Sequence, residues 1–211
     1  MNALRVVQQS EDGPRLTRVQ RERRQRIVNA ALNLAAQGGY EAVQMREVAA
    51  MAGVALGTLY RYFSSKEHLL VAAMAEQVAT LRQRMAERPA RGETSAERVI
   101  DVLRRATRAL QREPQVTSAM LKSLISPNAD VAETMQPVGE MMTDIVVTAI
   151  HHAAPDEHDR SVAMVIQHVW MASLLWWVAG LGPARQVEDR VNAAVHLLLG
   201  NGEEDATPAE R

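Results

Sequence analysis

The residues from Met45 to Lys66 include many side chains that could contact a polyanion. Hydroxyl and phenol groups donate hydrogen bonds to phosphate oxygens, and arginine and lysine add a positive charge. The candidates in this stretch are Arg46, Ala55, Leu56, Gly57, Thr58, Tyr60, Arg61, Tyr62 and Lys66. The two tyrosines could instead pack against a domain core, and we expect a mixed role for them.

Two short helices are predicted to position these side chains. The pattern predicts one helix over Met45–Ala52 and a second over Ala55–Tyr62, with Gly53 able to take the positive φ that a sharp turn requires. Two such helices joined by a glycine-containing turn form a helix-turn-helix, with Val54 and Leu59 filling the gap between them. In this arrangement the second helix lies in the major groove of DNA and presents its N-terminal residues to the base edges.

A basic segment precedes these helices. A helix is predicted from about Arg18 to Gln37, with Gly38–Gly39 as its stop. The run 15–26 is densely basic, which is typical either of a solvated helix start or of a segment that contacts the DNA backbone. Beside a helix-turn-helix we favour backbone contact by this run, including Arg18 and Arg21, and Arg15 and Arg18 could enter the minor groove as an arm would.

The charge of the chain changes sign along its length. The 24 Lys+Arg and 25 Asp+Glu give a formal net charge of −1. Residues 15–66 carry nine basic and three acidic groups, a net of +6, whereas residues 67–211 carry 14 basic and 20 acidic groups, a net of −6. A basic unit joined to an acidic one is typical of a DNA-binding domain with a separate partner domain. We therefore predict a flexible arm at 1–16, a helix-turn-helix domain at 17–66, a ligand-binding and dimerisation domain at 67–200 and a disordered acidic tail at 201–211.

The rest of the chain is predicted to be helical too, so the expected fold class is all-α with about nine helices. Apolar residues recur with helical spacing, and no run alternates apolar and polar residues over the length of a strand. Thr94 with Glu97 three residues later forms a capping box, and Asp156 begins a long apolar helix. Pro137 is expected to kink or divide the helix over about 128–152.

Composition and motifs disfavour several other functions. The absence of cysteine excludes disulfides, thiolate metal sites and cysteine nucleophiles, and it favours a cytoplasmic protein. The acids and histidines of 151–159 span a helix end and a new first turn, where acids normally cap, so we expect no metal there. The run Ser161–Gly182 is long enough to span a membrane, but Gln167 and His168 at its middle favour a buried helix. No Walker loop, nucleophile elbow or dinucleotide fingerprint occurs, so we expect neither an enzyme nor a cofactor.

The part of the chain from Met120 onward contains six of the eleven methionines and all three tryptophans. Such residues at helical spacing are typical of a core, but flexible thioethers also suit an adaptable cavity for a bulky apolar ligand. The cavity candidates are Leu103, Met120, Leu124, Val138, Met141, Met142, Ile145 and Trp170. Arg104, Arg108 and Arg112 recur at four-residue spacing on one ridge, which is either solvated surface or a place for phosphate groups.

Two late helices predict a homodimer. The segment 164–179 is apolar around its whole circumference and must be covered on all sides. One domain can hardly cover it together with the apolar stripe of 187–198, so we expect these helices to pair with their symmetry mates in a four-helix bundle. The residues expected at this interface are Leu174, Trp177, Val187, Val191, Val195 and Leu198. A two-fold dimer would place two recognition helices about 34–36 Å apart and predicts a palindromic operator.

The helix-turn-helix segment also carries a specific motif. The run Gly53-Val-Ala-x-Gly-Thr-Leu-Tyr-x-Tyr-Phe-x-Ser-Lys-Glu67, preceded by Gly38-Gly-Tyr40 and Arg26-Ile-Val-Asn-Ala-Ala-Leu32, resembles the N-terminal domain of TetR-family transcriptional regulators. Ala55 stands where that family commonly has a small polar residue, so the second helix lacks a hydroxyl N-cap worth about 1 kcal/mol. The resemblance implies a homodimeric repressor that binds double-stranded DNA.

Within this family, the whole sequence from Leu16 to the Trp-rich late helix resembles the actinobacterial repressors of sterol degradation. That resemblance implies control of lipid and cholesterol degradation genes. It also implies a small apolar effector, a CoA thioester of a cholesterol-derived acid, that releases the repressor from DNA.

Three functions are compatible with these observations to different degrees. A ligand-responsive repressor accounts for both the basic and the acidic unit. A DNA-binding protein without a ligand would use the C-terminal domain only for dimerisation and predicts a helical core without a cavity. An all-α enzyme would need a nucleophile or an acid/base pair in a pocket, and the sequence offers none that we can name.

Overall fold

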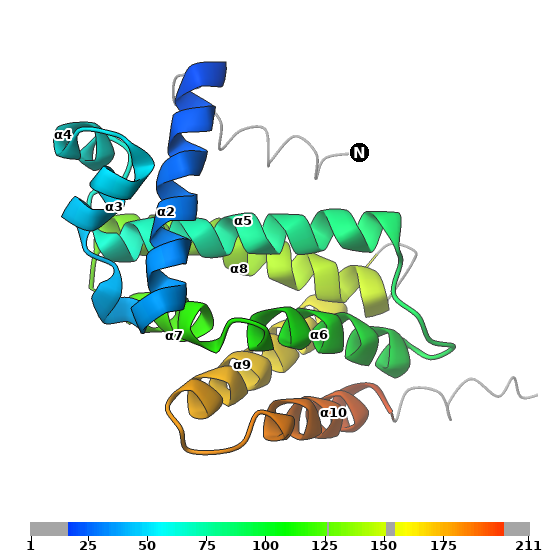
Figure 1. The fold of residues 1–211 in the computed structure, drawn as a ribbon. Helices are drawn as coiled ribbons and strands as arrows, with labels where there is room; N and C mark the ends of the chain where they lie inside the picture. Colours follow the sequence, from blue (N-terminus) through cyan, green and yellow to red (C-terminus); the bar gives the residue numbers. More distant parts are fainter. Residues whose placement is uncertain (1–16, 126, 151–154, 201–211) are drawn as a thin grey trace, which may run out of the picture.

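The computed structural model describes residues 17–125, 127–150 and 155–200 of the 211-residue chain. Within these ranges the chain forms nine helices and no strand, which confirms the predicted all-α fold (Figure 1). The predicted arm and tail and the histidine pair at 151–152 lie outside the described residues. The helices are α2 (Arg18–Ala42), α3 (Met45–Ala52), α4 (Leu56–Tyr60), α5 (Lys66–Glu87), α6 (Ser95–Gln111), α7 (Pro114–Ser123), α8 (Ala129–Ile150), α9 (Glu157–Val178) and α10 (Arg185–Leu199).

Helices α2, α3 and α4 form a small unit at one end of the molecule, with the first turns of α5 beside them (Figure 1). A capping box between Thr17 and Gln20 begins α2. The predicted stop is present, because Gly38 and Gly39 leave the helical conformation and Gly39 has a φ of 65°, before a last turn runs to Ala42. The break turns the chain toward α3.

The turn between α3 and α4 has the predicted geometry. Gly53 is left-handed, with a φ of 64° and a ψ of 42°, and its N–H bonds back to the end of α3. Helix α4 is shorter than expected, because Arg61 and Tyr62 form a turn rather than a last helical turn. Ala55 is the N-cap of α4 and makes no side-chain hydrogen bond, because a methyl group cannot accept one.

The remaining helices form a larger bundle around α5. Helix α8 packs along α5, α9 crosses beneath α8, and α10 packs against both α9 and α6 (Figure 1). The predicted capping boxes begin α6 at Thr94 and α9 at Asp156. Helix α8 runs as one element through Pro137, so this proline does not divide the helix, which was one of the two expected effects. Packing of the buried side chains on either side of it outweighs the one hydrogen bond that a proline cannot donate.

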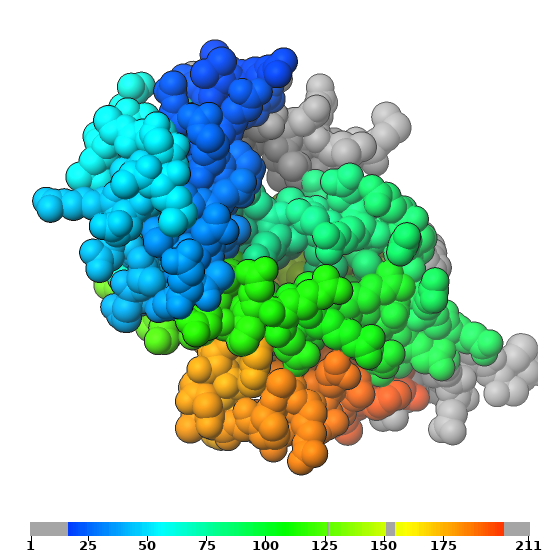
Figure 2. Space-filling model, in the orientation of Figure 1, coloured from blue at the N-terminus to red at the C-terminus, as the bar shows by residue number. Residues whose placement is uncertain are grey.

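A single hydrophobic core joins the two units. Buried apolar side chains run without interruption from Ile27 in α2 to Val195 in α10, and α2 packs against α7 across the predicted domain boundary. Figure 2 shows the blue and cyan helix-turn-helix unit seated directly on the green helices of the bundle. The boundary at residues 66–67 therefore falls at the start of α5, a helix that belongs to both units.

Helix α9 is long and apolar enough, by length and composition alone, to cross a membrane, and it is the one described helix that passes this test. Only 33% of its most apolar window is buried. Its inner side packs on α8 and α10, as expected for a core helix, but an apolar side remains uncovered.

The turn geometry predicts opposite effects for two glycine substitutions. A Cβ at Gly53 or Gly57 meets no atom within 4 Å, so only the backbone distinguishes them. Gly53→Ala should lower the free energy of unfolding by about 1 kcal/mol, because Gly53 is left-handed. Gly57 lies in a helix, so Gly57→Ala should leave the free energy of unfolding unchanged or raise it by up to about 1 kcal/mol. Urea unfolding measures both, and equal effects of the two substitutions would contradict the role assigned to Gly53.

Candidate nucleic-acid interface and internal cavity

One face of the small unit presents the predicted contact residues. Leu59 and Phe63 are buried and hold α4 against the unit's core. The side chains of the opposite face are accessible: Arg46, Ala55, Gly57, Tyr60 and Arg61 are exposed, and Leu56, Thr58, Tyr62 and Lys66 are half-buried. All nine therefore lie where a nucleic acid could reach them, and the half-buried tyrosine fits the expected mixed role.

Two of the predicted cations are held by other side chains. Arg18 is exposed and its Nε lies 2.8 Å from Oε1 of Glu22 one turn later. The Nζ of Lys66 lies 3.7 Å from the centre of the Tyr40 ring, a cation–π contact that keeps it at the start of α5. Arg21 is exposed and Arg15 lies outside the described residues. Exposed cations attract phosphate oxygens, and in a helix-turn-helix the N-terminal residues of the second helix, here α4, are the ones expected to meet base edges.

Tyr40 ties the end of α2 to the start of α5. Its hydroxyl donates a short hydrogen bond to Oε1 of Glu67. Burial, followed by this bond to a carboxylate, raises the pKa of the Tyr40 phenol well above its usual value. Burial opposes ionisation of Glu67, but the hydrogen bonds from Tyr40 and neighbouring groups outweigh it and lower the pKa of that carboxyl. The pair is therefore a neutral donor and a charged acceptor across neutral pH.

A second junction connects the small unit to α8. Ser64 donates to the carboxylate of Asp130, and Asn128 donates to Oγ of Ser65 at 3.3 Å. Beside them, Nδ1 of His68 accepts from the Ser64 backbone at 3.3 Å, and the His68 ring packs edge-on against Phe63. Burial lowers the pKa of His68, helped by Arg24 and opposed by Asp130 and Glu133.

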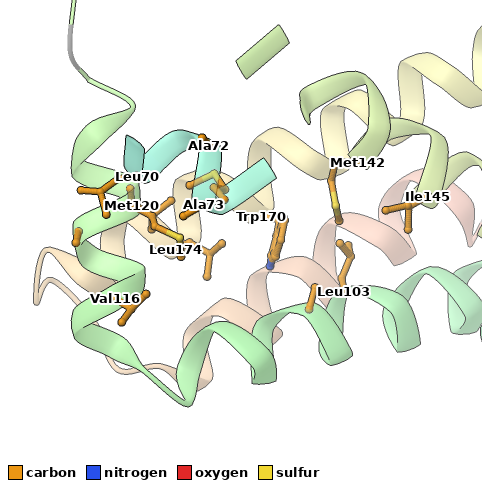
Figure 3. Close-up of a cluster of buried hydrophobic side chains, with 14 of the residues drawn as sticks. Leu70, Ala72, Ala73, Leu103, Val116, Met120, Met142, Ile145, Trp170 and Leu174 are labelled. Atoms are coloured by element: carbon orange, nitrogen blue, oxygen red, sulfur yellow. The ribbon is translucent and has the colours of Figure 1, made fainter. Parts of the chain in front are cut away.

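A cavity of about 1150 Å³ opens between α5, α6, α7, α8 and α9. This volume is slightly larger than the roughly 300–1,000 Å³ that small-molecule sites usually occupy. Figure 3 shows Trp170 near the centre of the surrounding buried cluster, with Met142 and Leu103 on one side and Met120 and Leu174 on the other. The apolar lining includes Met74, Val78, Leu81, Met85, Ala106, Leu110, Val116, Met120, Met135, Val138, Met142, Trp170, Met171 and Leu174.

Seven arginines lie around the same cavity. They are Arg84, Arg88, Arg91, Arg104, Arg105, Arg108 and Arg112. Arg105 is paired with Asp101, and Arg108 approaches Glu188 at 3.9 Å. In the described part of the chain Arg104 and Arg112 make no ion pair, so they are available to an anion. The ridge of Arg104, Arg108 and Arg112 thus borders the cavity, which favours the phosphate alternative over plain solvated surface.

The deep polar groups of the cavity wall already have partners. The indole N–H of Trp170 donates to Oγ1 of Thr107 at 2.8 Å, and both residues are buried. Thr117 donates to the carbonyl of Leu110 at 2.6 Å. Because these groups satisfy one another, the inner wall is apolar to an incoming ligand.

Half of the predicted ligand residues line the cavity. Met120, Val138, Met142 and Trp170 do so, whereas Leu103, Leu124, Met141 and Ile145 do not and pack elsewhere in the core. The predicted ligand residues do not include Met74, Val78, Leu81 and Met85 of α5, which also line the cavity. These four recur at helical spacing in the sequence, and such a stripe by itself predicts only a buried helix face. The stripe continues well beyond the last residue of the small unit, and that was the available signal.

Most of the predicted dimer residues are buried within one chain, so that assignment is corrected. Leu174 is 1% exposed and lines the cavity. Val187, Val191 and Val195 are buried between α10 and its neighbours α6 and α9. Trp177 is half-buried at a second, polar hollow of about 390 Å³, and only Leu198 is exposed, at 37%.

Other apolar side chains of α9, α10 and the loop between them are exposed. They are Met164, Val165, Trp176, Leu181, Leu197 and Leu198. Trp176 is held in place because its indole N–H donates to the Leu181 carbonyl at 2.8 Å and Arg190 lies over its ring. The uncovered apolar surface is therefore on the expected helices but, apart from Leu198, consists of residues other than the predicted ones.

Comparisons with known proteins agree with this architecture. Residues 27–73 match the sequence family described as bacterial regulatory proteins of the tetR family, and residues 92–198 match the tetracyclin repressor-like C-terminal domain. The HTH-type transcriptional repressor KstR of Rhodococcus jostii is 43% identical over 183 residues, which covers 87% of this chain and 85% of that protein.

Two solved structures resemble the fold over most of both chains. A TetR transcriptional regulator from Rhodococcus sp. RHA1 superposes with a TM-score of 0.78 at 35% identity, covering 86% of this chain and 98% of that one. FadR of Thermus thermophilus, a transcriptional repressor in complex with lauroyl-CoA, superposes with a TM-score of 0.70 at 22% identity, covering 89% and 99%.

The environment of His68 predicts a pH dependence of stability. Because its pKa is lowered in the folded protein, the unfolded chain binds the proton more readily. Neutral His68 therefore contributes its full share to the free energy of unfolding above the ordinary histidine pKa of about 6.5. This share is lost as the pH falls below that value. Between pH 7 and pH 5 the free energy of unfolding of His68→Asn should therefore fall less than that of the wild type. His196→Asn, at an exposed site on α10, is the control, and a wild-type slope in His68→Asn would contradict the assignment.

Proposed function

Because this chain belongs to the TetR family of bacterial regulatory proteins and is a transcriptional repressor rather than an enzyme, we propose that it is released from its operator by an acyl-CoA. In this proposal a homodimer binds a palindromic operator in the cytoplasm, without a cofactor, and controls genes of lipid or sterol degradation. The observation that carries the proposal is the large apolar cavity bordered by arginines.

The cavity matches an amphiphile with a bulky apolar body and a phosphorylated head. Met and Trp side chains from different helices can accommodate an irregular apolar shape, such as a steroid nucleus. Arg104 and Arg112 could bind the phosphates of CoA, because guanidinium groups pair well with phosphate oxygens. Lauroyl-CoA in the FadR structure supports this class of ligand, and the resemblance of the sequence to repressors of sterol degradation favours a steroid acyl-CoA.

The uncovered apolar surface of α9 and α10 supports the dimer. Pairing of Met164, Trp176 and Leu197 with a second copy would remove apolar side chains from water. A two-fold dimer through these helices leaves the helix-turn-helix units free and can set the recognition helices one DNA turn apart, about 34–36 Å. The palindromic operator follows from this symmetry.

A ligand-independent regulator is the alternative function. It requires a C-terminal core without a cavity, whereas about 1150 Å³ lie between the helices of this core. Unfilled apolar surface reduces stability, so a purely structural domain has no reason to keep it. The cavity therefore favours the ligand-responsive regulator.

The proposed release can be tested by mobility shift with an operator selected from random palindromic DNA. Addition of a CoA thioester of a steroid side-chain acid should weaken operator binding by about fivefold or more, the lower range of coupling between two sites. Free CoA is the control. If the complex survives saturating thioester while calorimetry shows that the thioester binds, the release step is wrong.

The role of the arginines predicts a difference between two ligands. In the double variant Arg104→Gln with Arg112→Gln, affinity for the CoA thioester should fall about tenfold, or 1.4 kcal/mol, because two phosphate contacts are lost. Affinity for the free steroid acid should stay within about twofold of the wild type. Lys122→Gln, an exposed cation that does not line the cavity, is the matched control. Equal losses for thioester and free acid would contradict the phosphate role.

A further inference from the structure

Glu76 is a charged residue in the wall of the cavity, and its carboxylate also forms hydrogen bonds to the helix-turn-helix unit. It lies in the middle of α5 and lines the cavity. Its Oε1 accepts from Nη1 of Arg24 at 2.5 Å, and its Oε2 accepts from Nε2 of Gln25 at 2.9 Å. One carboxylate thus binds two successive side chains of α2 with its two oxygens.

This contact is the polar link between α2 and α5 that a ligand can reach. Within the described residues, two sets of side-chain hydrogen bonds join α2 and α5, the Tyr40–Glu67 pair and the Glu76 contact. Tyr40 and Glu67 do not line the large cavity, whereas Glu76 does. A ligand in the cavity therefore has direct access to one link only.

The contact continues into the core of the small unit. The guanidinium of Arg24 lies over the ring of Phe63, 5.2 Å from its centre, and Phe63 is 1% exposed. Phe63 lies three residues after the end of α4 and helps to anchor that helix. Cavity wall, carboxylate, guanidinium and buried ring thus form one contiguous set of contacts that ends beside the recognition helix.

We propose that Glu76 couples the cavity to the helix-turn-helix unit. In the DNA-binding state, its carboxylate binds α2 through Arg24 and Gln25. These hydrogen bonds break when an apolar ligand fills the cavity beside Glu76. The inference rests on the proposed function and names the residue through which that function is regulated.

The physical reason is the cost of removing water from a charge. The side chains of Arg24 and Glu76 are 31% and 30% exposed, so water still reaches the pair. An apolar ligand beside Glu76 removes that water, and for ion pairs the loss of hydration often exceeds the gain in attraction. The carboxylate recovers hydration by turning away, and α2 and α5 are then free to shift relative to each other.

The coupling factor of matched variants tests the proposal. It is the operator Kd with saturating steroid acyl-CoA thioester divided by the Kd without it. Glu76→Gln and, from the other side of the contact, Arg24→Gln should each lower this factor by about fivefold or more. The ratio cancels any direct effect of Arg24 on DNA binding. The same change should appear in the ratio of thioester affinities with and without operator, because coupling is reciprocal.

The control removes the same charge elsewhere. Glu140 on α8 contacts Gln136 of its own helix and does not line the cavity, so Glu140→Gln should keep the wild-type factor. Thermal melts of all three variants verify that they fold. If Glu76→Gln is unstable, Arg24→Gln tests the same contact on its own.

The outcomes separate the two proposals. If the wild type responds to the thioester and Glu76→Gln and Arg24→Gln respond equally strongly, the role of Glu76 is overturned while the proposed function stands. If the wild type binds the thioester and its operator affinity does not change, the proposed function is overturned as well. A reduced factor in both variants with an unchanged factor in Glu140→Gln supports the coupling.

Discussion

Helix α5 must satisfy two sets of neighbours with one series of side chains, and the remaining architecture depends on this constraint. Its first turns bury Leu69 and Leu70 in the core shared with the small unit, and its later turns place Met74, Val78 and Leu81 along the cavity. Close-packed interiors transmit displacement rather than absorb it. In the proposed mechanism, a displacement of the cavity end of α5 therefore also displaces the turns that contact α2.

The cavity combines two surfaces that a compact core rarely brings together. Its inner wall is apolar because groups such as Trp170 and Thr107 bond to one another, whereas its border carries arginines. Unfilled apolar surface costs stability, and the continuous core from α2 to α10 offsets this cost. A ligand that buries an apolar body in the cavity and pairs with its guanidinium groups would recover the packing stabilisation that the unfilled volume lacks. This gain in free energy would favour binding at this site.

The distribution of charge and apolar surface assigns a separate task to each end of the molecule. The exposed cations of the small unit attract phosphate. Helices α9 and α10, which carry the exposed apolar side chains, lie away from α3 and α4, on the other side of the molecule (Figure 1). Because a dimer formed there leaves both basic faces free, two-fold symmetry and DNA binding do not compete.

Local signals in the sequence determined much of this protein. Capping boxes at Thr94 and Asp156, the left-handed Gly53 and the helix-turn-helix motif depend on residues a few positions apart, so they could be predicted without a tertiary structure. Helical spacing alone, however, says that a face is buried and not what covers it. For that reason Leu174, expected at a dimer interface, lines the cavity, and the α10 stripe of Val187, Val191 and Val195 packs within its own chain. Only the tertiary structure decided which arginines border the cavity and that Glu76 lies between it and Arg24, because these residues meet across helices distant in sequence.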